Sequence, residues 1–483
     1  MISFLIALAV LVGGYFIYGL VVEKIFGIDS KRPMPCDTMR DGVDYVPMST
    51  WKVFLIQFLN IAGLGPIFGA IMGIMFGPAA FIWIVVGTIF AGAVHDFISG
   101  AVSIRARGAS LPEVVGNELG TGIKQVMRVF SLILMVLVGA VFVSQPAALI
   151  AGMTPETFDV TFWAVVIFAY YMLATVLPID KLIGNLYPVF GFALLFMALG
   201  ILCVLIFGDN KIVDGFSEGI ASRHPGGLPI FPMMFVSIAC GAISGFHATQ
   251  SPMMARCLKN EKLARPVFYG AMVAEGIVAL IWAAAAIAFT GGYEGLTTYM
   301  AEHGNSAGAL VNDLSISWLG TFGGILALLG VIAAPITSGD TALRSARLIA
   351  ADFLHFDQSK VVKRLLISVP IFVATFAVMM IDFSVLWRYF AWCNQTLAVF
   401  TLWAVTVYLA RKKKFYLITM LPAMFMTAVS VSYILYARRP EGFGLDYSVA
   451  VGAGCVMAAL LCVLFYVYLQ RINSGKINRK FDY

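Results

Sequence analysis

The sequence predicts an all-α polytopic protein with about thirteen transmembrane helices, and three observations lead to this fold class. Of the 483 residues, 60% are hydrophobic and only 12% are charged, whereas soluble domains carry about 25% charged residues. Apolar stretches of about 20 residues, the length that spans the hydrocarbon core, recur along the whole chain. The basic residues gather in every second connection between these stretches. This composition excludes a disordered chain, a disulfide scaffold and a soluble enzyme.

The predicted spans follow one another with short connections. The first, 2–22, lacks a basic start and a small-residue cleavage motif, which favours a retained helix over a signal peptide. The others are 51–76, 79–103, 127–151, 160–178, 186–208, 231–256, 266–290, 320–343, 364–382, 384–409, 415–437 and 446–470. The longest connection on the outer side, about residues 291–319, is expected to be a loop that could serve as a lid.

The placement of Lys and Arg predicts the orientation, because these residues gather in cytoplasmic loops. Of the 32 Lys and Arg residues, 27 follow odd-numbered spans and five lie on the other side. Those five are Lys211, Arg223, Arg388, Arg438 and Arg439. The N-terminus is therefore expected outside and the tail, 471–483, in the cytoplasm. The net charge of +6 then reflects the basic residues that orient the protein in the membrane, and we expect no nucleic-acid partner.

Two predicted spans contain residues that interrupt a helix. The second has Ile61-Ala62-Gly63-Leu64-Gly65-Pro66 and the seventh has the run from Cys240 to His247. Glycine destabilises a helix interior by about 1 kcal/mol and proline by about 3 kcal/mol. Within lipid, broken backbone is tolerated where it is buried or lines a cavity. Close packing through small residues is the alternative interpretation.

The two broken spans are five spans apart, so they cross the membrane in opposite directions. This spacing predicts a 5+5 inverted repeat of the LeuT type, with substrate and ions held between the breaks. The expected organisation is a peripheral helix 1–22, repeats 51–208 and 231–409, two further helices in 415–470, and the tail 471–483.

The candidate substrate-binding residues lie at the breaks or carry polar side chains on the same spans and on the eleventh. They are Asn60, Gly63, Gly65, Gly241, Ser244, His247, Gln250 and Asn394. The N-terminus of a half-helix attracts anionic groups, and freed carbonyl groups attract cations. Interhelical hydrogen bonding is the alternative role for the amide side chains.

Ionisable residues within spans are costly and mark functional sites. His95 and Asp96 on the third span and Glu275 on the eighth are the candidates for proton coupling. The alternatives are a packing role for His95, an ion pair of Asp96 with Arg105 or Arg107, and a protonated structural carboxyl at Glu275.

The ninth span predicts a cation site. Thr337, Ser338 and Asp340 are the candidate ligands, and Thr341 is a further hydroxyl on the same span; they supply oxygen atoms, which a hard cation such as Na⁺ prefers. A pair between Asp340 and Arg344, one turn further on, is the alternative. Beyond this possible sodium site we expect no metal and no cofactor, since the sequence has no P-loop, HExxH or GxSxG motif.

Four segments resemble the carbon starvation protein family: QFLNIAGLGPIFGA (57–70), AGAVHDF (91–97), GAISGFHATQ (241–250) and YFAWCNQTLA (389–398). The resemblance implies a bacterial inner-membrane carrier similar to the amino acid–polyamine–organocation superfamily, with its LeuT-type repeat. Family members are implicated in peptide uptake and in proton-coupled pyruvate uptake. Many members are longer, and many carry His where this chain has Gln57. Proton coupling here would then rest on Glu275, His247 or Asp96, or the coupling ion differs.

We therefore expect a secondary transporter rather than an enzyme. It would import pyruvate, a related carboxylate or small peptides by alternating access coupled to H⁺ or Na⁺, and its partners would be this small molecule and the lipid bilayer. A sodium-coupled amino acid or peptide carrier and an ion or metabolite channel are the alternatives. The sequence leaves the oligomeric state open.

Overall fold

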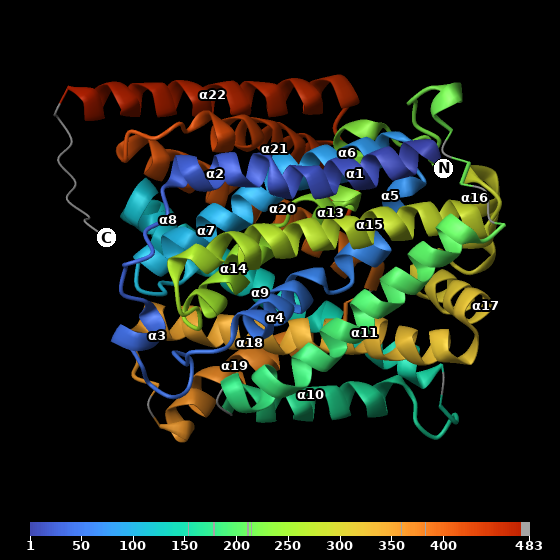
Figure 1. Ribbon diagram of the computed structural model, residues 1–483, viewed down its shortest axis with the longest axis horizontal. Coiled ribbons are helices and arrows are strands. Elements are labelled where there is room, and N and C mark those ends of the chain that lie inside the picture. The colour runs from blue at the N-terminus through green and yellow to red at the C-terminus, as the bar shows by residue number, and fades with distance from the viewer. Residues whose placement is uncertain are drawn as a thin grey trace.

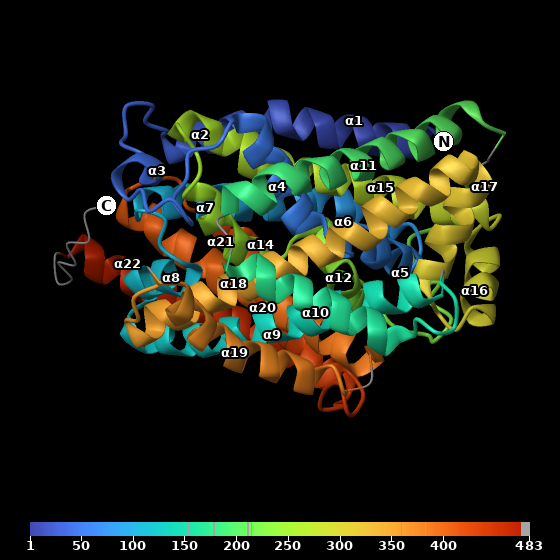
Figure 2. The same ribbon diagram turned by 90° about the horizontal axis from the view of Figure 1, so that it is seen from below.

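The computed structural model describes residues 1–152, 154–176, 179–209, 212–213, 215–358, 360–381 and 383–474, and in this part of the chain helices dominate. The long helices run along one common direction (Figure 1). In both views α3 and α8 lie at one end of the molecule and α16 and α17 at the other (Figures 1 and 2). We call the end with α3, α8 and the connection 412–416 the basic end. Residue 211 and the tail beyond residue 474 lie outside the described residues.

In chain order, the α-helices are α1 (Ile2–Phe16), α2 (Tyr18–Phe26), α3 (Pro35–Thr38), α4 (Thr50–Ala62), α5 (Ala70–Ile74), α6 (Ala79–Gly87), α7 (Ala93–Arg105), α8 (Leu111–Leu119), α9 (Thr121–Ala151), α10 (Val160–Val176), α11 (Ile179–Phe207), α12 (Phe235–Ser237), α13 (Ala239–Ala242), α14 (Gly245–Ala255), α15 (Gly270–Phe289), α16 (Tyr293–Glu302), α17 (Ala307–Ala327), α18 (Ala333–Leu354), α19 (Val361–Val378), α20 (Phe383–Arg411), α21 (Leu417–Tyr436) and α22 (Tyr447–Asn473). Short helical turns join or extend them: η1 (Gly65–Gly69), η2 (Thr88–Gly92), η3 (Phe216–Glu218), η4 (Ile230–Met234), η5 (Glu261–Leu263), η6 (Arg265–Tyr269) and η7 (Leu328–Ile332).

The membrane class predicted from composition is confirmed. Within the described residues, ten helices are long and apolar enough to cross a membrane, or eleven if the bent pair 50–62 and 65–74 is one span. The predicted number of about thirteen is therefore not confirmed. One predicted crossing, 160–178, contains a shorter apolar helix, Val160–Thr175.

Both predicted helix breaks are present. Helix α4 ends at Ala62, Gly63 takes a positive φ of 35°, and the chain resumes at a bend of 50°. The second break lies between α13 and α14, where Ile243 and Ser244 are extended. Glycine adopts positive φ without a steric penalty, which explains its place at the first break.

The two broken segments pack directly against each other. Turn η1 packs on α13, and α4 packs on α14. A Cβ atom added at Gly65 would collide with the side chain of Cys240, and one added at Gly92 would collide with the carbonyl oxygen of Ala242. The glycines therefore interrupt the helices and also let them pack closely, so both interpretations of these residues apply.

The segment 291–319 is not the long loop that the sequence suggested. It contains α16 and the first part of α17, which bends at Gly320, where φ is 64°. Leu310, Val311 and Leu314 are buried, and α17 packs against α11. Polar residues interrupt this apolar stripe. The segment was therefore too polar to be predicted as a membrane span from the sequence.

The basic end is tied together by ion pairs between distant segments. Arg105 Nε lies 2.7 Å from Glu261 Oε1, and Arg411 Nη1 lies 2.7 Å from Glu118 Oε2. These pairs connect α7 with the turn before α15, and α20 with α8. They hold the ends of the helices together where the basic residues gather.

Candidate functional site

A chain of buried ionisable groups begins on α7. Asp96 Oδ1 lies 2.8 Å from His95 Nδ1, and Asp96 Oδ2 lies 2.9 Å from His247 Nδ1 on α14. All three side chains are fully buried. The structure therefore joins His247, predicted to bind substrate, to the two residues predicted for proton coupling. Arg105, one of the two alternative partners predicted for Asp96, forms its ion pair with Glu261 instead.

Glu275 on α15 extends this chain. Its Oε2 lies 3.5 Å from His247 Nε2, and neither carboxylate oxygen has a hydrogen-bond partner among the described residues. An imidazole can donate a proton from one nitrogen and accept one at the other. Hydrogen bonds join His95, Asp96 and His247, and Glu275 lies 3.5 Å beyond His247; we call these four residues the His–Asp–His–Glu row.

The second break brings His247 to this position. The residue lies in the first turn of α14, and α14 packs closely along α7. Ser251, one turn further along α14, donates from Oγ to the carbonyl oxygen of His247 at 3.0 Å. Gln57 Nε2 on α4 lies 3.5 Å from Ser251 Oγ. Gln57 is therefore linked to the row through Ser251.

Asn394 holds the second break from α20. Its Oδ1 accepts hydrogen bonds from Ser244 Oγ at 3.0 Å and from the Phe246 backbone N–H at 2.6 Å. The adjacent Gln395 donates from Nε2 to the Ile243 carbonyl oxygen at 3.2 Å. A side-chain oxygen that accepts from the first turn of a helix acts as an N-cap. The structure therefore places Asn394, predicted to bind substrate, as a cap on α14.

Two further residues support the breaks and were missed in the sequence. Thr88 Oγ1 donates to the Gly241 carbonyl oxygen at 3.2 Å, and Cys240 Sγ accepts from Asn394 Nδ2 at 3.4 Å. Thr88 lies in an apolar span, and no neighbouring residue indicates that it contacts a helix break. The pair Asn394–Gln395 was visible as two amides within one apolar span, but its partner segment was not.

Hydroxyl groups of α18 meet the end of α4 at the first break. Ser338 Oγ donates to the Leu59 carbonyl oxygen at 3.1 Å, and Thr341 Oγ1 donates to Asn60 Oδ1 at 3.2 Å. Asn60 Nδ2 has no partner in the described part of the chain. These oxygen atoms surround the C-terminal end of a half-helix, where the backbone dipole favours a cation.

The predicted cation set is divided by the structure. Asp340 faces α11, where the phenol of Tyr187 donates to Asp340 Oδ2, whereas Ser338 faces α4. Residues two positions apart on a helix point about 200° apart, which explains the separation. Thr337 Oγ1 donates to Ala334 O within its own helix at 2.7 Å. Thr341, the further hydroxyl predicted on this span, lies with Ser338 at the end of α4.

The remaining predicted residues lie nearby. Gln250 donates from Nε2 to Thr249 Oγ1 at 3.0 Å, and its Oε1 has no partner among the described residues. An added Cβ at Gly241 would press on Ala279 of α15, and one at Gly63 on Phe142 of α9. The structure thus gathers the predicted substrate residues around the two breaks, all of them buried.

The carboxylate of Asp44 lies beside the basic end of α18. Arg344 Nη1 lies 3.1 Å from Asp44 Oδ1, and Arg347 Nη2 lies 3.3 Å from Asp44 Oδ2. Burial by itself raises the pKa of Asp44, but the guanidinium groups of Arg347 and Arg344 outweigh it and lower the pKa to about 2. The segment before α4 is thereby locked to α18.

The chain is similar in sequence to a known protein family and to several of its members. The family of the carbon starvation protein CstA matches residues 1–160 and 147–320. A membrane protein of Haemophilus influenzae is 43% identical over 338 residues, which cover 60% of this chain and 91% of that protein. The peptide transporter CstA of Campylobacter jejuni is 29% identical over 56% of this chain and 47% of its own length. The pyruvate/proton symporter BtsT of Escherichia coli is 28% identical over 55% of this chain and 46% of its own length.

The chain therefore spans about half the length of these two transporters. Among solved structures, a manganese transporter of Eremococcus coleocola aligns with a TM-score of 0.52 over 90% of this chain and 99% of that chain, at 12% identity. That likeness concerns the fold alone.

Proposed function

The chain belongs to the carbon starvation protein CstA family, and from this premise we propose that it is a cation-coupled secondary transporter that imports a small organic nutrient. The relatives with named activities are transporters and not enzymes. The candidate substrates are pyruvate or a related short carboxylate and small peptides, the classes named for the relatives. The observation that carries the proposal is the contact between two helix breaks beside a buried row of ionisable groups.

Alternating access would use two inverted five-helix repeats, 51–208 and 231–409, each beginning with a broken helix. The breaks at Gly63 and at Ile243–Ser244 support this arrangement, as does the packing of α4 on α14. Helix α1 with α2, and helices α21 and α22, would be peripheral. The proposed number of crossings is about thirteen: the ten long helices, the short helix α10, and the two broken segments α4–α5 and α13–α14.

The substrate would lie between the breaks, beside Asn60, Gly241, Ser244 and Gln250. Asn60 Nδ2 and Gln250 Oε1 are buried polar atoms without partners among the described residues. An unpaired buried polar atom costs about 1–3 kcal/mol. A polar substrate that bonds to them would recover this free energy, which favours a small molecule rich in carbonyl and carboxylate groups.

The His–Asp–His–Glu row supports H⁺ as the coupling ion. Its four members are fully buried and span α7, α14 and α15. Sodium coupling is the second candidate, and the oxygen atoms of Leu59, Asn60, Ser338 and Thr341 favour it. The transporter would need no other cofactor.

The membrane would be the inner membrane of a bacterium, with the basic end in the cytoplasm. The basic connections of α3, α8 and 412–416 support this orientation, because cytoplasmic loops are rich in Lys and Arg. The N-terminus, which lies at the opposite end in Figure 1, would then be outside.

Uptake into proteoliposomes tests the proposal. Labelled pyruvate and a labelled dipeptide would each be offered under an inward proton gradient, an inward sodium gradient or no gradient. Accumulation that depends on one gradient and is abolished by its ionophore would support a coupled transporter. Flux that never exceeds equilibrium, together with ionic current, would instead favour a channel.

A further inference from the structure

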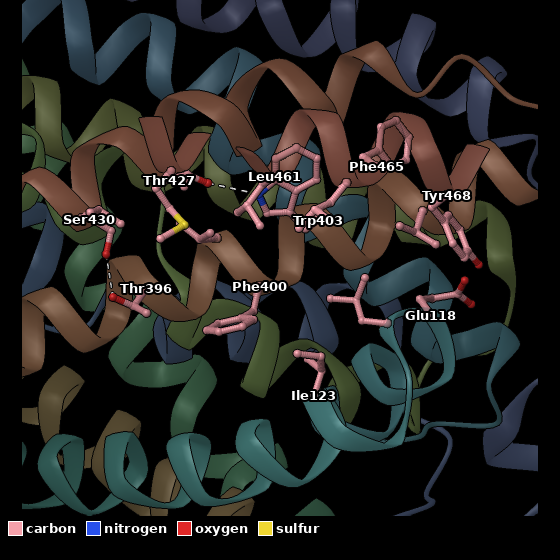
Figure 3. Close-up of a pocket in the computed structure, with 16 residues that line it drawn as sticks. Glu118, Ile123, Thr396, Phe400, Trp403, Thr427, Ser430, Leu461, Phe465 and Tyr468 are labelled. Carbon is pink, nitrogen blue, oxygen red and sulfur yellow. Dashed lines mark hydrogen bonds between the residues drawn. The ribbon is translucent and has the colours of Figure 1, made fainter. Parts of the chain in front are cut away.

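An apolar groove of about 530 Å³ runs between α20 and α22, away from both helix breaks. Figure 3 shows Phe400 of α20 below Phe465 and Tyr468 of α22, and Trp403 of α20 beside Leu461. Helix α22 packs mainly on α21 and contacts α20 at only a few places, which leaves the groove between them. The volume is in the range of sites that bind small molecules.

The polar groups in the groove are already paired with the protein. Thr396 and Ser430 hydrogen-bond to each other at 2.6 Å, and Trp403 Nε1 donates to Thr427 Oγ1 at 3.1 Å. These two bonds are the dashed lines in Figure 3. The walls therefore offer an occupant apolar contact and few open hydrogen-bonding groups.

The length of the groove matches one leaflet of a bilayer. On α20 it extends from Thr396 to Val407, and on α22 from Met457 to Tyr468. Eleven residue steps of α-helix are about 16 Å long, and half of the hydrocarbon core is about 15 Å. The groove thus begins near the middle of the membrane and opens at the basic end.

Two exposed basic residues lie beyond the end of the groove. Arg471 lies one turn beyond Tyr468 on α22, and Lys412 follows Arg411 at the end of α20. Glu118, the acidic lining residue at this end, forms an ion pair with Arg411 at 2.7 Å, so these two charges cancel. The excess charge at the mouth is therefore positive.

We propose that this groove binds one acyl chain of an anionic phospholipid, with the headgroup phosphate beside Lys412 and Arg471. The apolar walls, the depth of one leaflet and the cationic mouth are what such a lipid requires. The inference is independent of the substrate and of the coupling ion, and it assigns α22 a role as one wall of a lipid site.

Fluorescence quenching by brominated lipids tests this proposal on the full chain. The protein would be reconstituted with a small fraction of a brominated anionic phosphatidylglycerol or of brominated phosphatidylcholine. The difference between the protein and its Trp403→Phe variant isolates the emission of Trp403. We expect the anionic lipid to quench this emission at least about fivefold more effectively, since a single basic residue near an anionic headgroup already provides that ratio.

Arg471→Gln should remove most of that preference, whereas Arg438→Gln, an exposed residue near the other end of α21, should leave it unchanged. Native mass spectrometry gives a second measurement: Leu461→Trp should lose a retained anionic lipid, and Leu460→Trp, whose side chain is exposed and does not line the groove, should keep it. Equal quenching by both lipids would overturn the proposal. So would a change of oligomeric state in Leu461→Trp with lipid retention unaltered, since a second copy would then fill the groove.

Discussion

His247 Nδ1 lies 2.9 Å from Asp96 Oδ2, although 151 positions separate the two residues in the chain. This contact ties the first turn of α14 to the first turn of α7. Any movement of α14 about the break at Ile243–Ser244 would stretch or break it. If the row carries the coupling proton, as we propose, this hydrogen bond connects its protonation to the position of the half-helix.

The first prediction concerns Glu275 at the end of this row. Glu275→Gln keeps the shape of the side chain but cannot release a proton. We expect accumulation driven by a proton gradient to fall by more than about tenfold, because the row loses its terminal carboxyl. Exchange of labelled for unlabelled substrate, which needs no net proton movement, should persist. Uptake and exchange would be measured in the same proteoliposomes.

A matched control for this prediction is Glu302→Gln, at an exposed residue of α16. It should leave both rates unchanged. Gradient-driven accumulation at the normal level in Glu275→Gln would remove Glu275 from the coupling mechanism. Loss of both uptake and exchange would point to a structural role.

The second prediction concerns His247, which links Asp96 to Glu275. His247→Gln retains a polar side chain but cannot pass a proton between two nitrogens. We expect accumulation driven by a proton gradient to fall by about tenfold or more, because the imidazole that lies between Asp96 and Glu275 is lost. The control is His303→Gln, at the exposed residue that follows α16. Normal gradient-driven accumulation in His247→Gln would contradict a role for this residue in the row.

The sequence predicted the two breaks well because their cause is local. Glycine and proline interrupt a helix wherever they lie, and Gly63 and Gly245 mark the breaks that the structure shows. The roles of His247 and Asn394 were not predictable in the same way. Each depends on a partner about 150 positions away, so the sequence revealed a polar residue in a span but not its contact.

The sequence also could not show which neighbouring helix each side chain of α18 faces. Asp340 and Ser338 were grouped because they are close in sequence, yet they contact α11 and α4 respectively. Only the packing of α18 between these helices decides which face meets which neighbour. Of the oxygen-bearing residues predicted on this span, Ser338 and Thr341 therefore meet the first break, and Asp340 does not.

The third prediction concerns Asn394 as a cap. Asn394→Ala removes the acceptor for Ser244 Oγ and for the Phe246 N–H. We expect a loss of about 1–3 kcal/mol in stability, since a helix cap is lost and buried donors are left unpaired. Thermal unfolding of the purified protein measures this loss. Asn394→Asp, which keeps an acceptor oxygen, should restore part of it.

If Asn394 instead served mainly to bind substrate, Asn394→Ala would raise the KM for uptake and leave the unfolding temperature unchanged. Gln470→Ala, which removes an exposed amide from α22, is the control for the substitution itself. It should alter neither quantity.

The fourth prediction separates the two faces of α18. If sodium is the coupling ion, Ser338→Ala and Thr341→Val should each weaken the dependence of uptake on sodium by about tenfold, because each removes an oxygen atom at the end of α4. Asp340→Asn should leave this dependence unaltered, since Asp340 contacts Tyr187 of α11. Sodium titration of uptake measures all three variants. A strong effect of Asp340→Asn alone would move the cation site to the α11 face.

The last prediction concerns Asp44, which connects the segment before α4 to Arg344 and Arg347. Its pKa of about 2 in the folded protein lies below its ordinary value of 3.8. A lowered pKa contributes stability that is present above about pH 4 and is lost as the pH falls through about 2, and the shift corresponds to roughly 2 kcal/mol. Asp44→Asn should therefore lower the unfolding temperature at pH 7, and the difference from the unaltered protein should shrink as the pH approaches 3.

Asp37→Asn, at an exposed residue of α3, should show no such difference. A deficit in Asp44→Asn that stays constant from pH 7 to pH 3 would mean that the ion pairs with α18 do not stabilise this segment.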